Sequence, residues 1–218
     1  MRVAIVTGGA LEDLDWLKDQ LSSYDQIIAV DRGLEAFESM GLIPDFIIGD
    51  FDSYAGCADF ETRYPETEVM TFDSQKDWTD TELALHKAMA LCATHPEGSV
   101  IDMFGAFGSR VDHMFANLML LTSIKEKYPR VRALDPNNEV ERLYPGTYGI
   151  IRREGFYVSV LSIDEAASVS LRGFEYDGEA LRMYRSGTLG VSNRLIEDTG
   201  SVEVQEGPVF LMQCRDRK

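Results

Sequence analysis

The stretch VIDMFGAFGSRVDH, residues 100–113, indicates the fold more clearly than any other segment. It begins with the short apolar run Val100–Phe104, which is typical of a buried strand. A glycine-containing loop, Gly105–Arg110, follows, and Val111 then begins a stretch with helical spacing of apolar residues. Strand, loop and helix in this order form part of a βαβ unit, so the segment predicts a parallel sheet flanked by helices.

The same alternation extends outward over residues 1–134. The other predicted strands are Val3–Val6, Ile27–Val30, Phe46–Ile48, Val69–Phe72 and Val131–Leu134. Apolar residues recur at helical spacing between them, with Gly41 as an expected helix end. The pair Thr79 and Glu82 has the spacing of a capping box that begins a helix. We therefore predict an α/β fold with a Rossmann-like parallel-sheet domain at residues 1–134.

The pattern changes to a period of two after Asp135-Pro136, and we expect the joint between the two domains at Pro136-Asn137-Asn138. Strands are expected at Tyr148–Arg152, Phe156–Ile163, Ser168–Leu171, Ser201–Gln205 and Val209–Cys214. No helical pattern is evident in this part of the chain. These features predict a small all-β domain at residues 135–218, built as a sandwich or a barrel.

The charge balance limits the choice of partners. The chain has 21 Lys and Arg residues against 37 Asp and Glu residues, which gives 21 − 37 = −16, and it has no basic run. Nucleic acid and anionic membrane surfaces are therefore poor partners. An anionic substrate would require a metal ion or a local basic patch to bind such a protein.

Cysteine usage and the N-terminus favour a cytoplasmic protein. Cys57, Cys92 and Cys214 are odd in number and lack C-x-x-C spacing, which argues against a disulfide framework and a thiolate zinc site. The apolar stretch at the N-terminus is too short for a signal peptide, and no later run could span a bilayer.

Acidic residues and glycines follow nearly every predicted strand of the first domain. The strand ends lead into Gly8-Gly9, Asp31-Arg32-Gly33, Gly49–Ser53, Gln75–Asp80 and Gly105–His113. Ligands bind outside the carboxyl ends of the strands in open parallel sheets. Each such residue alone is an ordinary turn or cap residue, and Asp77 or Thr79 could simply cap a helix.

Asp50 and Asp52 are harder to explain as turn residues. Alternate residues of an extended segment point the same way, and two adjacent carboxylates repel unless a cation or proton lies between them. Asp80, in the first turn of a predicted helix, could complete the site. Oxygen ligands without Cys or His favour Mg²⁺ over zinc, and a solvated acidic rim is the competing interpretation.

The loop Gly105–Arg110 resembles a phosphate cradle, with glycines, a helix N-terminus and the fork-shaped donor Arg110. It is not a Walker A sequence, which requires G-K-[ST]. Asp112 and His113 lie at the helix start, where His113 could be a base or only a partly buried polar residue. His86 and His95 lack metal-ligand spacing and are expected at the surface.

In chain order, these motifs resemble those of the thiamine pyrophosphokinase family. The matching motifs are Val30–Gly33, Gly49–Ser53, Lys76–Asp80 and Gly105–His113, followed in the tail by Gly190-Val191-Ser192-Asn193. The tail motif is similar to the thiamine-site motif of that family's small domain. Arg32 and Ser109 depart from the pattern because glycine is usual at both positions, and a larger residue in a loop narrows the approach of the backbone to phosphate in the placement of ATP.

The resemblance implies a Mg²⁺-dependent transfer of the pyrophosphoryl group of ATP to thiamine, giving thiamine diphosphate and AMP in a homodimer. It implies that Asp50, Asp52 and Asp80 hold the metal and the triphosphate, as catalytic residues together with Asp112. ATP would be bound by Asp31, Gly33, Gly49, Ser53, Gly105, Gly108, Arg110 and His113, and thiamine by Lys76, Asp112, Ser192 and Asn193.

Other functions are compatible with the residues alone. An aspartyl-phosphate phosphatase also places D-x-D after a parallel strand, but Ser53-Tyr54 follows here instead of the usual Gly-Thr. A pterin pyrophosphokinase would perform the same reaction on another acceptor. A nucleotide- or vitamin-binding protein without turnover is the non-enzymatic alternative. The sequence leaves open the general base, the nucleotide preference, the preferred divalent ion and the subunit that supplies each thiamine contact.

Overall fold

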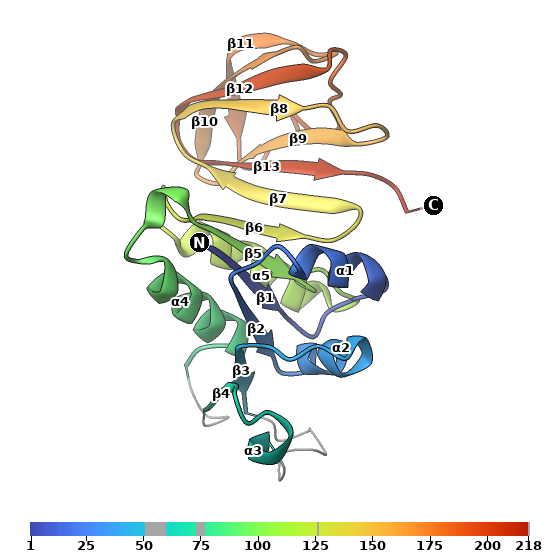
Figure 1. Ribbon diagram of the computed structural model, residues 1–218. Coiled ribbons are helices and arrows are strands. Elements are labelled where there is room, and N and C mark those ends of the chain that lie inside the picture. Colours follow the sequence, from blue (N-terminus) through green and yellow to red (C-terminus); the bar gives the residue numbers. More distant parts are fainter. Residues whose placement is uncertain (51–59, 73–76, 126, 218) are drawn as a thin grey trace. The chain divides into compact units, whose positions relative to one another are not determined.

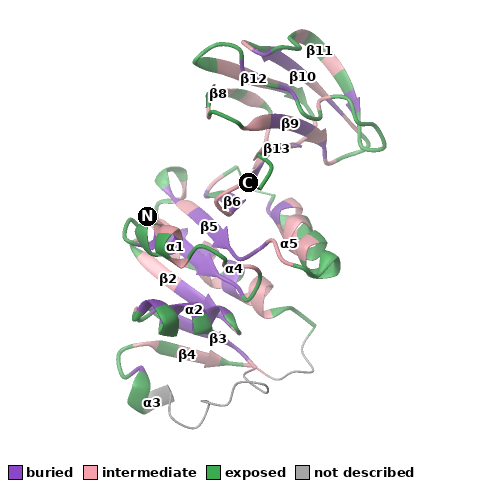
Figure 2. Ribbon diagram, turned by 90° about the vertical axis from the view of Figure 1, so that its right-hand side faces the viewer, coloured by how far each residue is buried: buried purple, intermediate pink, exposed green. Residues whose placement is uncertain are grey.

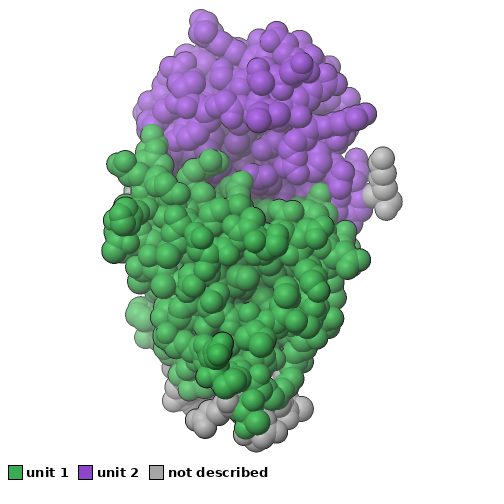
Figure 3. All heavy atoms as spheres, viewed as in Figure 1, with its two compact units in different colours: residues 1–136 green, residues 137–218 purple. Residues whose placement is uncertain are grey.

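The computed structural model describes residues 1–50, 60–72, 77–125 and 127–217. The chain divides into two compact units, residues 1–136 and 137–218 (Figure 3). The candidate residues Asp52, Ser53 and Lys76 lie outside the described residues. In the described part of the chain, no helix is both long and apolar enough to cross a bilayer.

Unit 1 is built on a parallel sheet with the strand order β4-β3-β2-β1-β5-β6 (Figure 1). The strands are β1 (Arg2–Val6), β2 (Gln26–Val30), β3 (Phe46–Gly49), β4 (Glu68–Thr71), β5 (Val100–Phe104) and β6 (Arg130–Leu134). Neighbouring strands in this order pair in parallel. The predicted parallel sheet is confirmed, including all of its predicted strands.

The helices of unit 1 lie between these strands in the sequence. They are α1 (Leu14–Leu21), α2 (Gly33–Met40), α3 (Phe60–Arg63), α4 (Asp80–Cys92) and α5 (Val111–Ser123), with a 3-10 turn at Pro96–Gly98. Gly41 ends α2 with a left-handed φ of 65°. The Thr79 hydroxyl accepts a hydrogen bond from the Glu82 amide at 3.2 Å and so caps α4. Both helix limits were predicted from sequence, whereas α3 was not.

The strand order has a reversal between β1 and β5. From β1 the chain adds β2, β3 and β4 in turn on one side, and it then places β5 and β6 on the other side of β1. With right-handed crossovers, the loops that leave β1 and β5 lead to helices on opposite faces of the sheet, and a ligand-binding crevice is expected at this reversal, at the carboxyl edge of the sheet. The central strands are buried (Figure 2), so the loops at their ends rest on a rigid support.

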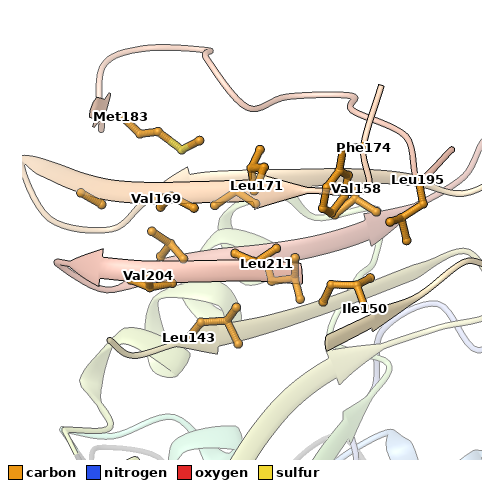
Figure 4. Close-up of a cluster of buried hydrophobic side chains, with 14 residues drawn as sticks. Leu143, Ile150, Val158, Val169, Leu171, Phe174, Met183, Leu195, Val204 and Leu211 are labelled. Atoms are coloured by element: carbon orange, nitrogen blue, oxygen red, sulfur yellow. The ribbon is translucent and has the colours of Figure 1, made fainter. Parts of the chain in front are cut away.

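Unit 2 contains two antiparallel sheets. Its strands are β7 (Asn138–Leu143), β8 (Gly146–Ile151), β9 (Tyr157–Ser162), β10 (Ala166–Arg172), β11 (Gly178–Tyr184), β12 (Thr199–Glu206) and β13 (Val209–Cys214). Strands β7, β13 and β9 pair in that order, and so do β11, β10, β12 and β8. Apolar side chains from both sheets, among them Val158, Leu171 and Val204, form one core (Figure 4). The predicted sandwich is confirmed.

Two strands of unit 2 were not predicted. β7 begins at Asn138, within the segment that was interpreted as the joint, and charged residues interrupt its alternation. β11 is mostly exposed, and among its described residues only Met183 is buried. Neither strand has the regular period-two pattern that identifies a half-buried strand from sequence.

Candidate active site

A cavity of about 480 Å³ lies at the carboxyl edge of unit 1. It is lined by Thr7, Gly8, Gly9, Ala10, Val30, Asp31, Arg32, Thr81, Gly105, Ala106, Gly108, Ser109, Arg110, His113 and Asn117. These residues come mainly from the loops after β1, β2 and β5 and from the first turns of α5. The cavity therefore occupies the reversal point that the strand order defines.

The loops after β1 and β5 are in direct contact and are joined by hydrogen bonds. The Thr7 hydroxyl donates to the Gly105 carbonyl oxygen at 2.7 Å, and the Ala10 amide donates to the Phe107 carbonyl oxygen at 3.1 Å. A Cβ atom at Gly9 would lie 1.9 Å from the Gly105 carbonyl oxygen. Glycine at residue 9 thus permits a backbone contact that no side chain would allow, and it leaves the cavity wall made of peptide groups.

We expect Gly105→Ala to destabilise unit 1 by about 2–3 kcal/mol. Gly105 has a φ of 70°, and a Cβ atom there would lie 2.4 Å from the Thr7 carbonyl oxygen, so strain and overlap add. Urea unfolding followed by tryptophan fluorescence measures the change, because Trp16 and Trp78, the chain's two tryptophans, both lie in unit 1.

Gly41→Ala is the matched control for this substitution. Gly41 has a similar φ of 65°, but a Cβ atom there would meet nothing within 4 Å. Gly41→Ala should therefore lower the free energy of unfolding by only about 1 kcal/mol, which is the strain of a residue with a Cβ atom in the left-handed region. Equal losses of stability in the two variants would contradict the proposed close contact between the loops.

Asp31 follows β2 and borders the cavity. Its φ is 48°, and its backbone amide donates to the Ile48 carbonyl oxygen at 3.0 Å. The neighbouring Arg32 also lines the cavity, and its guanidinium pairs with Glu35 at 3.1 Å. Gly33 is buried at the start of α2 and does not line the cavity.

Asp50 and Asp80 lie at the same edge of the sheet. Asp50 follows β3 directly, and Asp80 is the first residue of α4. Because α4 connects the parallel strands β4 and β5, its N-terminus lies at the carboxyl edge. Both aspartates are half-buried, and both are outside the lining of the cavity, whereas Thr81 belongs to it.

The chemistry of these two side chains fits Mg²⁺, which binds oxygen ligands and keeps several water molecules. Within the ranges that the structure describes, no group of three His, Cys, Asp or Glu side chains could hold a metal ion. The predicted third ligand, Asp52, lies outside the described residues, so the full set Asp50, Asp52 and Asp80 stays a prediction.

Arg110 and Asp112 form an ion pair at the start of α5. The Arg110 Nη2 atom lies 2.6 Å from the Asp112 Oδ2 atom, and its Nε donates to Oδ1 at 3.2 Å. The hydrogen bond from Arg110 is the main cause that lowers the pKa of Asp112 to about 2. Asp112 is therefore ionised at neutral pH, and part of the Arg110 donor fork is already engaged.

We expect Arg110→Gln to raise the pKa of Asp112 toward the ordinary carboxyl value of about 4. The guanidinium favours the ionised carboxylate, so its removal makes protonation easier. The ¹³C chemical shift of the Asp112 carboxyl carbon, followed from neutral to acidic pH, gives the pKa. Arg32→Gln, which interrupts the similar exposed pair with Glu35, should leave it unchanged. An Asp112 pKa that stays near 2 in Arg110→Gln would show that another group causes the shift.

Several lining residues were not predicted from the sequence. Asn117 lies one helical turn beyond His113 on α5, and its side-chain amide donates to the Ala106 carbonyl oxygen at 3.0 Å. The four-residue spacing from His113 was the signal that could have identified it, because such residues share a helix face. Thr7 and Thr81 also line the cavity.

The candidate residues of unit 2 lie in the loop between β11 and β12. Ser192 is exposed, has a φ of 59°, and donates its backbone amide to the Ser159 hydroxyl at 3.0 Å. Asn193 is buried. Its side-chain oxygen accepts from the Tyr176 and Arg194 amides, and its amide nitrogen donates to the Tyr176 carbonyl. The Asn193 side chain therefore fixes the loop, while Ser192 faces solvent.

Comparison with known families covers both units. The family described as "Thiamin pyrophosphokinase, catalytic domain" matches residues 17–133. The family described as "Thiamin pyrophosphokinase, vitamin B1 binding domain" matches residues 147–209. The first match alone spans more than half of the chain.

Individual relatives are similar over the whole length. The chain is 27% identical over 216 residues to the thiamine pyrophosphokinase of Bacillus subtilis (strain 168), covering 98% of this chain and 99% of the relative. A crystal structure of the enzyme from Bacillus subtilis covers 100% of both chains at 29% identity, with a TM-score of 0.87. A structure from Geobacillus thermodenitrificans covers 100% of this chain and 99% of that chain at 29% identity, with a TM-score of 0.84.

Proposed function

The chain belongs to the thiamine pyrophosphokinase family, whose reaction is pyrophosphoryl transfer from ATP to thiamine, and we propose how its own residues carry out that reaction. Neither the fold nor the relatives favour a phosphatase, a pterin pyrophosphokinase or a binding protein without turnover. The observation that carries the proposal is the pair of glycine loops joined at the reversal between β1 and β5.

We propose that this crevice binds the triphosphate of ATP. The loops present backbone groups at Gly8, Gly9 and Gly108, and the N-terminus of α5 adds a partial positive charge beside them. Arg110 and His113 line the same cavity as candidate donors, although Asp112 already engages Arg110. Anion binding at this edge would offset the repulsion expected from a net charge of −16.

Asp50 and Asp80, together with the undescribed Asp52, would hold Mg²⁺ at this edge. When bound, the ion would neutralise charge on the phosphate oxygens. The aspartates would fix it relative to the glycine loops, since Asp50 directly follows the buried strand β3 and Asp80 begins a capped helix. Attachment to these rigid elements gives the precision that phosphoryl transfer requires.

The chemical step replaces one bond to the β-phosphorus with another. The hydroxyl oxygen of thiamine forms a bond to the β-phosphorus of ATP. The bond between the β-phosphorus and the oxygen that bridges the α- and β-phosphates breaks. AMP leaves and keeps the bridging oxygen. The hydroxyl proton is lost to a base or to water. With its pKa lowered to about 2, Asp112 is a weak proton acceptor, so positioning and electrostatics supply most of the acceleration.

For thiamine, we propose that Ser192 and Asn193 of unit 2 contribute binding residues, and that Lys76 and Asp112 of unit 1 contribute as well. The exposed Ser192 hydroxyl is available for a ligand, and Asn193 would act by holding the loop in its left-handed turn. Lys76 lies outside the described residues, and its role rests on the motif resemblance.

We further propose a homodimer. Val111, Phe115 and Met119 are exposed and lie four residues apart on α5, so they form one apolar stripe. Such a stripe on a helix supports an interface with a second copy. Sedimentation equilibrium should give twice the mass of the chain, and a monomer at assay concentration would contradict the dimer.

We also propose that the partners are the small-molecule substrates, without nucleic acid or a membrane, and that the protein is cytoplasmic.

An assay of AMP formation tests the proposed function. With ATP and Mg²⁺, we expect AMP and thiamine diphosphate to form together when thiamine is added, and neither to form with a chelator present. A parallel reaction with a hydroxymethyl pterin tests the acceptor. AMP release that does not depend on thiamine, or that depends on the pterin instead, would overturn the assignment.

A further inference from the structure

Unit 2 contains a second cavity, of about 250 Å³. It lies where the connection between β8 and β9 meets the end of β13, beside Arg194 and Leu195. Arg152, Arg153 and Arg194 contribute its charge, and Phe156, Tyr157 and Gln213 line the same space. All of these residues belong to unit 2, and none belongs to the proposed ATP site.

The cavity is basic in a strongly acidic protein. Arg153 pairs with Glu139 at 3.0 Å. Within the ranges that the structure describes, neither Arg152 nor Arg194 forms an ion pair with a carboxylate. In a chain of net charge −16, most arginines could find an acidic partner. Unpaired guanidinium groups that gather in a hollow are a recognition element for oxyanions.

Aromatic rings orient two of the three guanidinium groups, those of Arg153 and Arg194. Arg153 lies 3.8 Å from the ring centroid of Phe156, and Arg215 lies 5.0 Å from the same ring. Arg194 lies 4.4 Å from the ring centroid of Tyr157 and also donates to its hydroxyl. Arg194 gives one N–H donor to the Tyr157 hydroxyl and Arg153 gives one to Glu139, but contact with a ring face uses no N–H donor, so several donors remain for a ligand. A site ordered in advance loses less entropy when it binds.

We propose that this cavity is an anion site that takes a phosphate or diphosphate group. A phosphate group has several oxygens that can accept hydrogen bonds from two or three guanidinium groups at once, which a single carboxylate does less well. The cavity has room for such a group. The source is either free inorganic phosphate or diphosphate, or the diphosphate end of a small phosphorylated molecule. The inference does not depend on the proposed function.

The test is a titration of the ¹⁵N-labelled full-length protein by NMR, without Mg²⁺ and at constant ionic strength set with chloride. The ligands are inorganic phosphate, inorganic diphosphate, thiamine diphosphate and AMP, each in a separate titration. We expect saturable shifts of the Gly155, Tyr157 and Arg194 amides with millimolar or tighter affinity. Tighter binding of the inorganic anions identifies them as the ligand, and tighter binding of thiamine diphosphate identifies a phosphorylated molecule.

The double variant Arg152→Gln/Arg194→Gln should weaken binding at these amides roughly a hundredfold, about tenfold for each lost charge-assisted contact. Arg172→Gln removes an exposed arginine of the same unit that pairs with Glu179, and it should leave the affinity unchanged. Unshifted signals elsewhere in unit 2 show that the variants are folded. The proposal is overturned if none of the ligands shifts these amides, or if the double variant binds as tightly as the unmodified protein.

Discussion

Replacing Asp50 by asparagine is expected to lower kcat roughly a thousandfold, a loss of about 4 kcal/mol of transition-state stabilisation, while the fold stays intact. The substitution keeps the size of the side chain but removes the charge of a proposed metal ligand. Asp50 is half-buried in a loop directly after β3 and is not part of the hydrophobic core of unit 1. Steady-state AMP formation measures kcat, and urea unfolding checks the fold.

Asp19→Asn is the matched control for this experiment. The chemical change is the same as in Asp50→Asn, but Asp19 is exposed on α1, so the Asp19→Asn enzyme should have normal activity. If Asp50 acts through Mg²⁺, higher concentrations of the ion should restore part of the activity of Asp50→Asn. Near-normal turnover of the variant at low Mg²⁺ would contradict the metal assignment, and the same expectation holds for Asp52→Ala.

Replacing Asp102 by alanine is expected to destabilise unit 1 by about 3–5 kcal/mol, because it removes the fully buried carboxylate that pairs with the largely buried Arg132 guanidinium. Asp102, on β5, is fully buried and lies opposite Arg132 of β6. It accepts two hydrogen bonds from Arg132, each 2.7 Å long, and one from the Tyr24 hydroxyl. Burial and the nearby Asp102 charge raise the pKa of Tyr24, so the phenol stays a donor at neutral pH.

Glu35→Ala gives the comparison for an exposed ion pair. Glu35 pairs with Arg32 at 3.1 Å, but both side chains are more than half exposed, so the loss should stay under about 1 kcal/mol. Tryptophan fluorescence during urea unfolding follows unit 1 in both variants. A loss from Asp102→Ala as small as that from Glu35→Ala would show that the buried network contributes little to stability.

The architecture could be predicted because local signals agreed with it. Short apolar runs separated by helical spacing identified every strand of the parallel sheet, and the β1 and β5 loops were both recognised as glycine-rich. Strands β7 and β11 were missed because partner strands, and not their own alternation, stabilise them. Pairing with neighbours overrides weak local patterns in sheets.

The candidate site was predictable at the level of loops but not of individual contacts. The sequence placed Asp31, Gly105 and Arg110 at one edge, and the structure puts all three around one cavity. It could not show that Asp112 engages Arg110 or that Asn193 is buried, because both facts depend on rotamers and on neighbouring loops. Charge and spacing identify candidate ligands, whereas hydrogen-bond partners decide which of their atoms remain available.

A crystal structure with thiamine, Mg²⁺ and α,β-methylene ATP would test the central claim most directly. In this analogue a methylene group replaces the bridging oxygen that is cleaved, so the substrates remain intact. We predict that the triphosphate lies along the loops of Gly9 and Gly105 and that the ion contacts Asp50 and Asp80. A triphosphate bound away from the β1 and β5 loops, or an ion that contacts neither aspartate, would contradict the account.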